Sequence, residues 1–252
     1  MRSCTFAVTH FLVACLLSIA SAEAQWGTIK GQVTVTGTVS ELPVLVKSGE
    51  PATKDSSICA AADIPNESII INPRSKGLAN VVFWLSQKPT SIHPDLIKSK
   101  EPEVVLRQTG CRYAPHVTIM RTDQKLRLLN SDAVAHNQHI YAMKNVQFSA
   151  VVAPSSREGE LVSYLTKPES LPIKIGCDIH PWMQGWIVVQ DHPYVATTNS
   201  DGEFEIVNLP TGEHEFRIWH EQAGYLEKAY KVSVKQGNNV LSPTKVPATA
   251  FK

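Results

Sequence analysis

The feature that most constrains the fold is a series of eight short β-strand patterns between residues 104 and 190. Turn residues separate the patterns, most clearly at Ser155–Gly159. Short strands at this spacing are typical of a β-sandwich or a β-barrel, and about 90 residues is the size of one such unit. The predicted strands are Val104–Leu106, Val117–Arg121, Lys125–Asn130, His136–Ala142, Gln147–Val152, Leu161–Leu165, Ile173–Cys177 and Gly185–Gln190.

Composition agrees with an all-β protein and excludes some classes of partner. The 252-residue chain carries a formal charge of only +1, with 16 prolines and 13 glycines. Low charge and frequent Val, Ile and Thr suit β-strands, and the length is sufficient for one large or two small domains. A nearly neutral chain gives no electrostatic reason to expect nucleic acid or an anionic membrane surface as a partner.

The part of the chain before residue 104 predicts further strands joined by long connections. Trp26–Val35 alternates as one strand, and Ser68–Ile71 and Asn80–Leu85 are two more. Residues 41–67 are rich in Pro, Ser, Ala and charge and predict a long loop tethered through its cysteine. Residues 89–103 hold three prolines and predict a boundary, with one helical turn near residues 94–98.

The part of the chain after residue 190 carries a second pattern. Residues 198–218 read D-G-x-F, then N-L-P-x-G, then another alternating strand, and Asp201-Gly202 supplies the positive φ that a tight hairpin requires. This succession resembles the carboxypeptidase regulatory-like modules, which are small transthyretin-type sandwiches. Such modules normally begin with the G-x-I-x-G-x-V form, which is present far upstream at Gly27–Val33.

We therefore expect residues 25–100 and 191–246 to form one discontinuous sandwich, with residues 101–190 inserted as a second sandwich and residues 247–252 as a frayed tail. Two consecutive sandwiches divided near residue 190 are the simpler alternative. Modules of the regulatory-like kind often serve as spacers or carbohydrate-binding attachments. Trp219 and Tyr225 are the nearby aromatic candidates for sugar binding, and we favour the spacer role.

Residues 1–24 have the pattern of a signal peptide. Arg2 supplies a basic start, Phe6–Ile19 an apolar core, and Ala22-Glu23-Ala24 a small-x-small cleavage site. The apolar run is too short to favour a permanent membrane helix, so we expect a periplasmic or secreted protein that is not integral to a membrane. A rival motif is Leu12–Cys15, which looks like a lipobox and would make Cys15 a lipidated N-terminus.

The stretch Gly176–Met183 places a cysteine, a histidine and a methionine close together between two apolar segments. Thiolate, imidazole and a weak axial thioether are ligands of blue-copper electron-transfer sites. Alternation places Ile173, Ile175 and Cys177 on one face of the preceding strand, and Met183 on the inward face of the returning strand. Both sulfur-containing side chains are therefore expected to point into a core.

A second imidazole is needed, and the candidate is His136, in a His-Asn pair after a strand and a polar turn. Together with the C-x2-H-P-[aromatic]-M spacing of the later loop, this pair resembles the cupredoxins, and the amicyanins among them, over roughly residues 104–190. The expected fold is a cupredoxin Greek-key β-sandwich. The resemblance implies that His136, Cys177, His180 and Met183 hold one type 1 copper. It also implies that Asn137 links the two ligand loops by hydrogen bonding.

The same resemblance implies single-electron transfer with a redox partner protein. In cupredoxins the partner docks on an apolar patch beside the later histidine. Here that patch would be Pro181 and Trp182, with one edge of the His180 imidazole reaching solvent. Trp182 could equally be core packing.

Cysteine number is consistent with this interpretation. Cleavage after residue 24 leaves Cys59, Cys111 and Cys177, and three cysteines in an oxidising compartment suggest one pair and one left over. In the copper interpretation Cys59 and Cys111 form a structural disulfide, and Cys177 is a metal thiolate.

Alternative sites and functions are weaker. One thiolate, two imidazoles and a thioether are not a usual zinc set, and haem attachment would need C-x-x-C-H. His139 faces the opposite way from His136 on a strand, whereas His116 is expected to begin a strand. No H-x-H or H-C-H pattern of copper enzymes occurs, so an electron-transfer protein is favoured over a catalyst. The rivals are a copper carrier or storage protein and a non-redox β-sandwich binding module for carbohydrate or cell surfaces.

Overall fold

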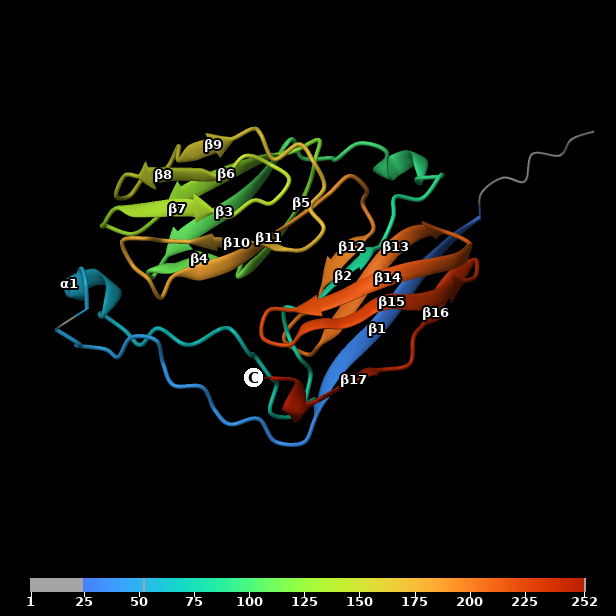
Figure 1. The fold of residues 1–252 in the computed structure, drawn as a ribbon, viewed down its shortest axis with the longest axis horizontal. Helices are drawn as coiled ribbons and strands as arrows, with labels where there is room; N and C mark the ends of the chain where they lie inside the picture. Colours follow the sequence, from blue (N-terminus) through green and yellow to red (C-terminus); the bar gives the residue numbers. More distant parts are fainter. Residues whose placement is uncertain (1–24, 52, 252) are drawn as a thin grey trace, which may run out of the picture.

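The computed structural model describes residues 25–51 and 53–251 and consists of two β-sandwiches side by side (Figure 1). The predicted signal peptide, Cys15 included, lies outside these residues. Within the described part of the chain, no helix has the length and apolar character needed to cross a membrane. The strands are β1 (Trp26–Thr36), β2 (Val82–Leu85), β3 (Glu103–Thr109), β4 (Arg112–Ala114), β5 (Val117–Arg121), β6 (Lys125–Asn130), β7 (His136–Ile140), β8 (Phe148–Val152), β9 (Glu160–Val162), β10 (Ile173–Gly176), β11 (Gln184–Gln190), β12 (Val195–Thr197), β13 (Glu203–Pro210), β14 (Gly212–His220), β15 (Gly224–Val234), β16 (Gly237–Val240) and β17 (Thr244–Pro247). Helical turns are α1 (Ser56–Cys59), η1 (Pro94–Leu96) and η2 (Ala248–Ala250).

The first sandwich draws its strands from both ends of the described chain. One sheet has the order β13-β1-β16, with β17 also paired to β1, and the other has the order β12-β2-β14-β15. Ile29 of β1 lies opposite Ile206 of β13, and the stacked rings of Phe83 and Phe204, 3.8 Å between centroids, fill the space between the sheets. Because β2 pairs with β12, the chain leaves this sandwich after residue 85 and returns to it beside the same strand.

The second sandwich uses only strands β3 to β11. Its five-stranded sheet has the order β5-β11-β10-β7-β8, and its four-stranded sheet has the order β4-β3-β6-β9. Leu106, Leu126, Ile140 and Ile175 are essentially inaccessible to solvent between the two sheets. The apolar residues that alternate along the predicted strands therefore build this core, and the all-β, two-sandwich fold class is as predicted.

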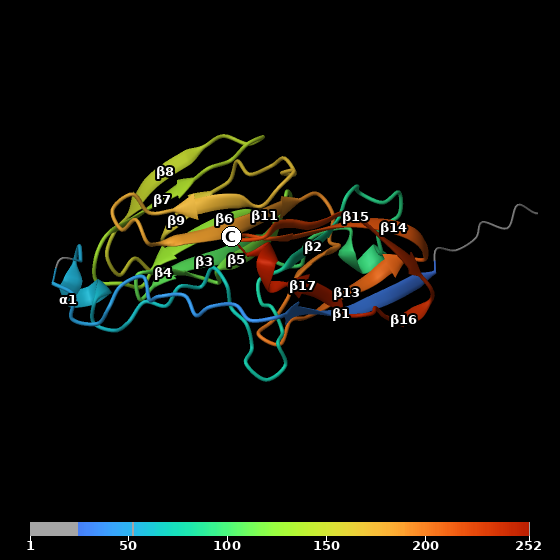
Figure 2. The same cartoon turned by 60° about the horizontal axis from the view of Figure 1, so that its bottom comes forward.

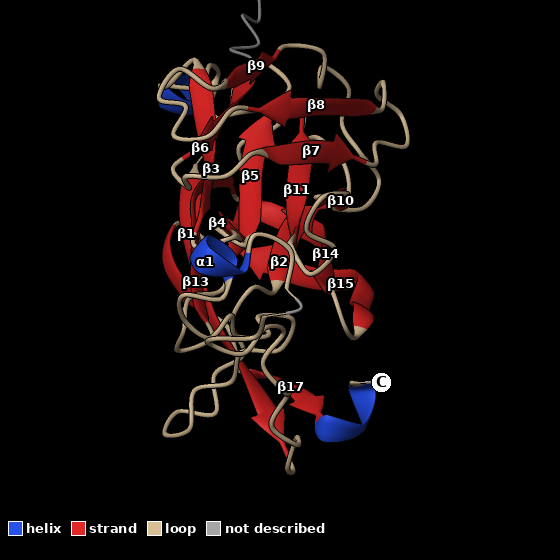
Figure 3. Cartoon of the chain, turned by 90° about the vertical axis from the view of Figure 1, so that its left-hand side faces the viewer, coloured by secondary structure: helices blue, strands red, loops and turns tan. Residues whose placement is uncertain are grey.

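The loop at residues 41–67, which we call the strap, leaves β1 and packs on the second sandwich. Figures 1 and 2 show α1, at its tip, lying at the end of the second sandwich that is farthest from the first. Figure 3, which looks from that end, shows α1 in front of the strands. Val46, Cys59 and Ile64 join the core of the second sandwich, and Cys59 forms a disulfide with Cys111. Position along the chain assigns the strap to the first sandwich, but its buried side chains belong to the second.

Two local predictions were wrong, and one strand of the second sandwich was missed. Ser68–Ile71 is not a strand, because the chain turns back at Asn72, whose backbone N–H donates to the Gly77 carbonyl at 2.9 Å. Strand β4 was not predicted. The expected tail, residues 247–252, begins at the last residue of β17, which pairs in parallel with β1 and ties down the chain as far as Phe251.

The predicted Asp201-Gly202 hairpin is also different in the structure. Gly202 has the expected positive φ of 73°, but the turn joins β12 and β13, which belong to different sheets. The turn is packed tightly, since a Cβ on Gly202 would lie 2.1 Å from the Val33 carbonyl oxygen. This glycine therefore allows the turn to lie directly against the backbone of β1 and of the Gly77–Leu78 segment.

The two sandwiches meet along an apolar junction formed by Val82, Trp84, Val117, Val188 and Trp219. Trp219 lies edge-on to Trp186 at 4.8 Å between ring centroids. The Tyr225 hydroxyl donates to the carbonyl of Ser170 at 3.3 Å. Trp219 and Tyr225 are therefore part of the junction and do not form an exposed platform for sugars.

A buried polar contact crosses the same junction. The Glu221 carboxylate contacts the His116 imidazole and accepts a hydrogen bond from the Trp186 indole N–H at 3.0 Å. The side chains of Glu221 and His116 are both more than nine-tenths buried. His116 immediately precedes β5, one residue before the strand that it was expected to begin, and it pairs with an acid from the other sandwich.

Candidate metal centre

A polar turn between β6 and β7 positions the first imidazole of the candidate site, that of His136. Asn130, the last residue of β6, is buried, and its side-chain amide donates to the Val134 carbonyl at 2.8 Å and accepts from the Asp132 N–H at 2.9 Å. This turn brings Asp132 beside His136, the first residue of β7. Asp132 Oδ2 lies 2.9 Å from His136 Nε2.

Asp132 is held as a carboxylate. Burial tends to raise its pKa, but hydrogen bonds from His136 and from the backbone N–H groups of Cys111 and Gly110 place the pKa below its usual range. A carboxylate behind Nε2 favours the imidazole tautomer that carries its proton there. His136 Nδ1 then faces the site.

The Cys177 loop joins β10 to β11 and is closed by its own backbone. The Cys177 N–H donates to the Met183 carbonyl at 3.2 Å, and the Met183 N–H donates to the His180 carbonyl at 2.9 Å. Cys177 is 4% exposed and Met183 is 2% exposed. The alternation of Ile173 and Ile175 therefore predicted the inward direction of Cys177 correctly.

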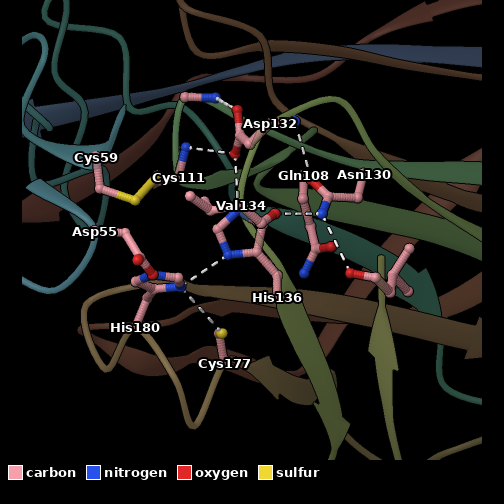
Figure 4. A network of polar contacts seen from close by, with 12 residues as sticks. Asp55, Cys59, Gln108, Cys111, Asn130, Asp132, Val134, His136, Cys177 and His180 are labelled. Atoms are coloured by element: carbon pink, nitrogen blue, oxygen red, sulfur yellow. Dashed lines mark hydrogen bonds and ion pairs between the residues drawn. A yellow bond between two sulfur atoms is a disulfide. The ribbon is translucent and has the colours of Figure 1, made fainter. Parts of the chain in front are cut away.

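Three potential ligand atoms converge between these two loops (Figure 4). His136 Nδ1 lies 2.8 Å from His180 Nδ1, and His180 Nδ1 lies 3.7 Å from Cys177 Sγ. The ligand atoms of His136, Cys177 and His180 all lie within 4.8 Å of one another, and all three residues are buried. The structure thus brings the ligand atoms of three of the four predicted copper ligands within 4.8 Å of one another. Met183 is buried in the same loop as Cys177 and His180.

The thiol in this cluster is unusually acidic. Burial tends to raise the pKa of Cys177, but contacts with His136 and His180 and the nearby backbone N–H groups lower it to about 6. The pKa of His136 is raised: burial opposes this, but the Asp132 carboxylate and the Cys177 sulfur overcome it. The cluster therefore favours a thiolate, which is the form that binds metals.

Asn137 connects the two loops. Its side-chain oxygen accepts from the backbone N–H of Asp178 at 2.6 Å and of Ile179 at 3.3 Å, and its amide nitrogen donates to Asp178 Oδ2 at 2.7 Å. These contacts join the start of β7 to the residues that follow Cys177. They are the kind of contact that the resemblance implied for this residue.

The second imidazole differs from expectation. His180 is fully buried, and its Nε2 lies 2.9 Å from Asp55 Oδ2, a residue of the strap. The expectation that an edge of His180 reaches solvent was therefore wrong, because the strap covers it. Pro181 is exposed, whereas Trp182 is partly buried and its indole N–H donates to the Cys111 carbonyl at 3.3 Å.

Sequence reasoning did not identify three residues that lie around the site: Asp55, Asp132 and Tyr113. The Tyr113 hydroxyl lies 2.9 Å from the Gly176 carbonyl oxygen and 3.1 Å from that of Asn137. Asp132 could have been suspected from its place in the turn before His136. Asp55 and Tyr113 come from a loop and an unpredicted strand, and no periodic pattern marks them.

Other histidines do not join the cluster. His139 is partly exposed on β7 and contacts Asp178, with 3.1 Å between Nδ1 and Oδ2. It lies on the face of the strand opposite to His136, as predicted. Cys111 is also close to Asp132 and His136, but its sulfur is bonded to Cys59 and cannot act as a thiolate ligand.

Comparison with known proteins gives partial matches. No protein-family model and no curated protein matches the chain. The Cu-containing nitrite reductase of Thermus scotoductus SA-01 is 21% identical over 40% of this chain and 25% of its own length, with a TM-score of 0.31. A mutant of amicyanin in the Cu(I) form is 17% identical over 36% of this chain and 86% of its own, with a TM-score of 0.29. A purple cupredoxin from Nitrosopumilus maritimus is 19% identical over 35% of this chain and 99% of its own, with a TM-score of 0.27.

Fold and site together define an all-β protein of two sandwiches, one of which holds a buried cluster of one cysteine and two histidines. The three solved structures named above, each similar to part of this chain, are a Cu-containing nitrite reductase, an amicyanin and a purple cupredoxin.

Proposed function

We propose that the chain is a mononuclear type 1 copper protein that transfers single electrons, with His136, Cys177, His180 and Met183 as ligands. The observation that carries this proposal is the convergence of two imidazole Nδ1 atoms and one acidic thiol in a buried cluster. One thiolate, two imidazoles and a buried thioether are the donor set of blue-copper sites.

The hydrogen bonds of the two histidines support the same assignment. Each Nε2 lies against a carboxylate, Asp132 for His136 and Asp55 for His180. If both Nε2 atoms carry protons, the 2.8 Å contact between the two Nδ1 atoms needs one further proton in the metal-free protein, and a metal ion that displaced this proton would meet two Nδ1 lone pairs and a thiolate. Such a cluster of electron donors is stabilised by a cation, so the residues present fit a copper ion without rearrangement of their partners.

The chain's own residues would exclude water and fix the ligands, while bound copper would supply a one-electron couple. Four protein ligands leave no open position for a substrate, so electron transfer is favoured over catalysis. The acceptor or donor would be a redox partner protein. With the predicted signal peptide removed, the protein would act in the periplasm or outside the cell.

The test is visible and EPR spectroscopy of residues 25–252 after addition of Cu(II). We expect an intense thiolate-to-copper band and a narrow copper hyperfine splitting, both lost in Cys177→Ser and His136→Ala. His139→Ala is the matched control, because this histidine lies three residues along the same strand but outside the cluster. A colourless protein that binds no stoichiometric copper would overturn the proposal.

Electron transfer and copper storage use the same ligands and differ in turnover. A redox titration separates them. Reversible, spectroscopically complete cycling between Cu(II) and Cu(I) without loss of metal supports electron transfer, whereas release of copper on reduction indicates a carrier.

A further inference from the structure

The strap places a carboxylate from a distant part of the chain directly behind the second imidazole. Asp55 and His180 are 125 residues apart in sequence, and Oδ2 of the first lies 2.9 Å from Nε2 of the second. The His180 side chain is fully buried, whereas that of Asp55 is 31% exposed. Asp55 therefore stands between the imidazole and solvent.

The position of Asp55 is fixed by the backbone around it. Asp55 adopts the left-handed conformation, with φ 53° and ψ 43°, and no side-chain capping bond of α1 uses its carboxylate. The backbone N–H groups of Ile58 and Cys59 donate to its carbonyl, both at 2.9 Å. The carboxylate is thus free to face His180 while the main chain forms the turn.

The strap itself is anchored to the second sandwich at two points. Val46 and Ile64 bridge across the base of the strap, with the Ile64 N–H donating to the Val46 carbonyl at 2.9 Å, and both side chains are buried. At the tip, Cys59 is bonded to Cys111. The N–H of Cys111 in turn donates to Asp132 Oδ2 at 2.8 Å.

The disulfide therefore joins the strap to the segment that holds the other carboxylate. His136 has Asp132 behind its Nε2, and His180 has Asp55 behind its Nε2, so each imidazole has one carboxylate partner (Figure 4). The sandwich supplies the first carboxylate from its own turn. The second is supplied by a loop that begins in the other sandwich.

We propose that Asp55 is a positioning residue for the metal centre: it holds the His180 imidazole with its proton on Nε2 and its Nδ1 toward Cys177, and the disulfide-anchored strap closes this ligand off from solvent. This inference rests on the proposed copper function for its consequence, but the orientation of His180 is a property of the protein without metal. A carboxylate behind a ligating histidine fixes its tautomer and ring orientation, and its loss typically weakens metal binding by about 10–100-fold.

Two substitutions separate the carboxylate from the backbone turn. Asp55→Gly removes the side chain and suits the left-handed conformation, because glycine has no Cβ. Asp55→Asn keeps a hydrogen-bond acceptor without the charge and also tolerates this conformation. The matched control is Asp63→Asn, an exposed carboxylate of the same strap that accepts from the Ser48 N–H at 2.7 Å and does not contact the site.

The first measurement uses metal-free protein. Nitrogen-15 NMR of the histidine rings reports which nitrogen carries the proton. We expect His180 to be in the Nε2–H form in wild type and in Asp63→Asn, and to become a mixture of tautomers in Asp55→Gly. An unchanged His180 tautomer in Asp55→Gly, with folded-protein spectra, would overturn the proposal.

The second measurement loads each variant with Cu(II) and follows transfer of the metal to an excess of chelator. We expect transfer from Asp55→Gly to be at least about tenfold faster than from wild type, with Asp55→Asn in between and Asp63→Asn unchanged. Equal transfer rates in wild type and Asp55→Gly would overturn the positioning role. If wild type binds no copper, the proposed function fails, and the NMR result still decides whether Asp55 orients His180.

Discussion

The acidity of Cys177 is a property of the metal-free protein and can be titrated directly. The ordinary value for a thiol is 9.0, and the structure lowers the pKa of Cys177 to about 6. At pH 7 the side chain should therefore be about nine-tenths thiolate, whereas an ordinary cysteine would be about one-hundredth thiolate. The thousandfold difference in acidity corresponds to about 4 kcal/mol in favour of the charged form.

The lowering of the Cys177 pKa has identifiable sources. Burial of Cys177 acts in the opposite direction, so the contacts with His136 and His180 and the backbone N–H groups must outweigh it. Removing one imidazole removes part of that stabilisation. We therefore expect the midpoint of thiolate formation to move upward in His136→Ala and in His180→Ala.

The assay is the ultraviolet absorbance of the thiolate in metal-free protein, measured as the difference between wild type and Cys177→Ser at each pH. The subtraction removes the tyrosine signal. A midpoint at the ordinary thiol value, or a midpoint that is the same in wild type and both histidine variants, would refute the argument.

The pH dependence of the free energy of unfolding is a less direct measure of the Cys177 pKa, because Cys177 and His136 change this free energy in opposite directions as the pH rises. The lowered pKa of Cys177 contributes stability above the unfolded value of 9.0, and this is lost as pH falls toward about 6. The raised pKa of His136 contributes stability below its ordinary value of 6.5, and this is lost as pH rises through the folded value. Both contributions are stabilising, but their dependences on pH have opposite slopes near neutral pH, which is why the thiolate itself should be measured.

Three further predictions concern stability, each measured by urea unfolding of metal-free protein. Replacing Cys59 and Cys111 together by serine should lower the free energy of unfolding by about 4 kcal/mol, since the bond closes a loop of 52 residues; an unchanged value would contradict the anchoring of the strap. Asn137→Ala should lower the free energy of unfolding by roughly 1–3 kcal/mol, because the backbone N–H of Asp178 loses its acceptor. A loss smaller than about 0.5 kcal/mol would argue against the cross-loop role. Glu221→Gln should cost about 1.5–3 kcal/mol by weakening charged hydrogen bonds across the sandwich junction, and no change would show that apolar packing alone holds the junction.

Much of the candidate site could be predicted because its residues follow strand alternation and a compact motif. Alternation along Ile173–Cys177 fixes which side chains face the core, and the structure confirms the inward direction of Cys177 and Met183. The partner histidine, His136, could be suggested only by resemblance, because nothing in its local sequence specifies which distant loop it will meet. The two loops are far apart in the chain: Asn137 and Asp178, which join them, are separated by 41 positions.

The covering of the site could not be predicted, for a physical reason. The strap has no period of two or of 3.6 residues, and its direction is decided by a disulfide and a few buried apolar contacts at its base. From sequence alone, a long loop of this kind is interpreted as a simple connection between strands. The same limitation hid β17, because a short strand on a sheet edge gains its stability from pairing with β1 and not from its own sequence.

The strand connectivity has a consequence for the order in which the protein assembles. Among the strands that the structure describes, β1 pairs only with β13, β16 and β17, and β2 pairs only with β12 and β14. Every strand of the second sandwich, by contrast, pairs with another strand between residues 103 and 190.

As the chain becomes available from its N-terminus, the second sandwich can therefore fold while β1 and β2 still have unpaired edges. Cys59 precedes that sandwich and can close onto Cys111 as soon as its strands form. The strap would then be fastened over the candidate metal centre before the first sandwich, from which it extends, has formed. Folding from the middle of the chain outward leaves β1 as a long unpaired strand until β13, β16 and β17 are available, and the edges of such a strand are prone to aggregation.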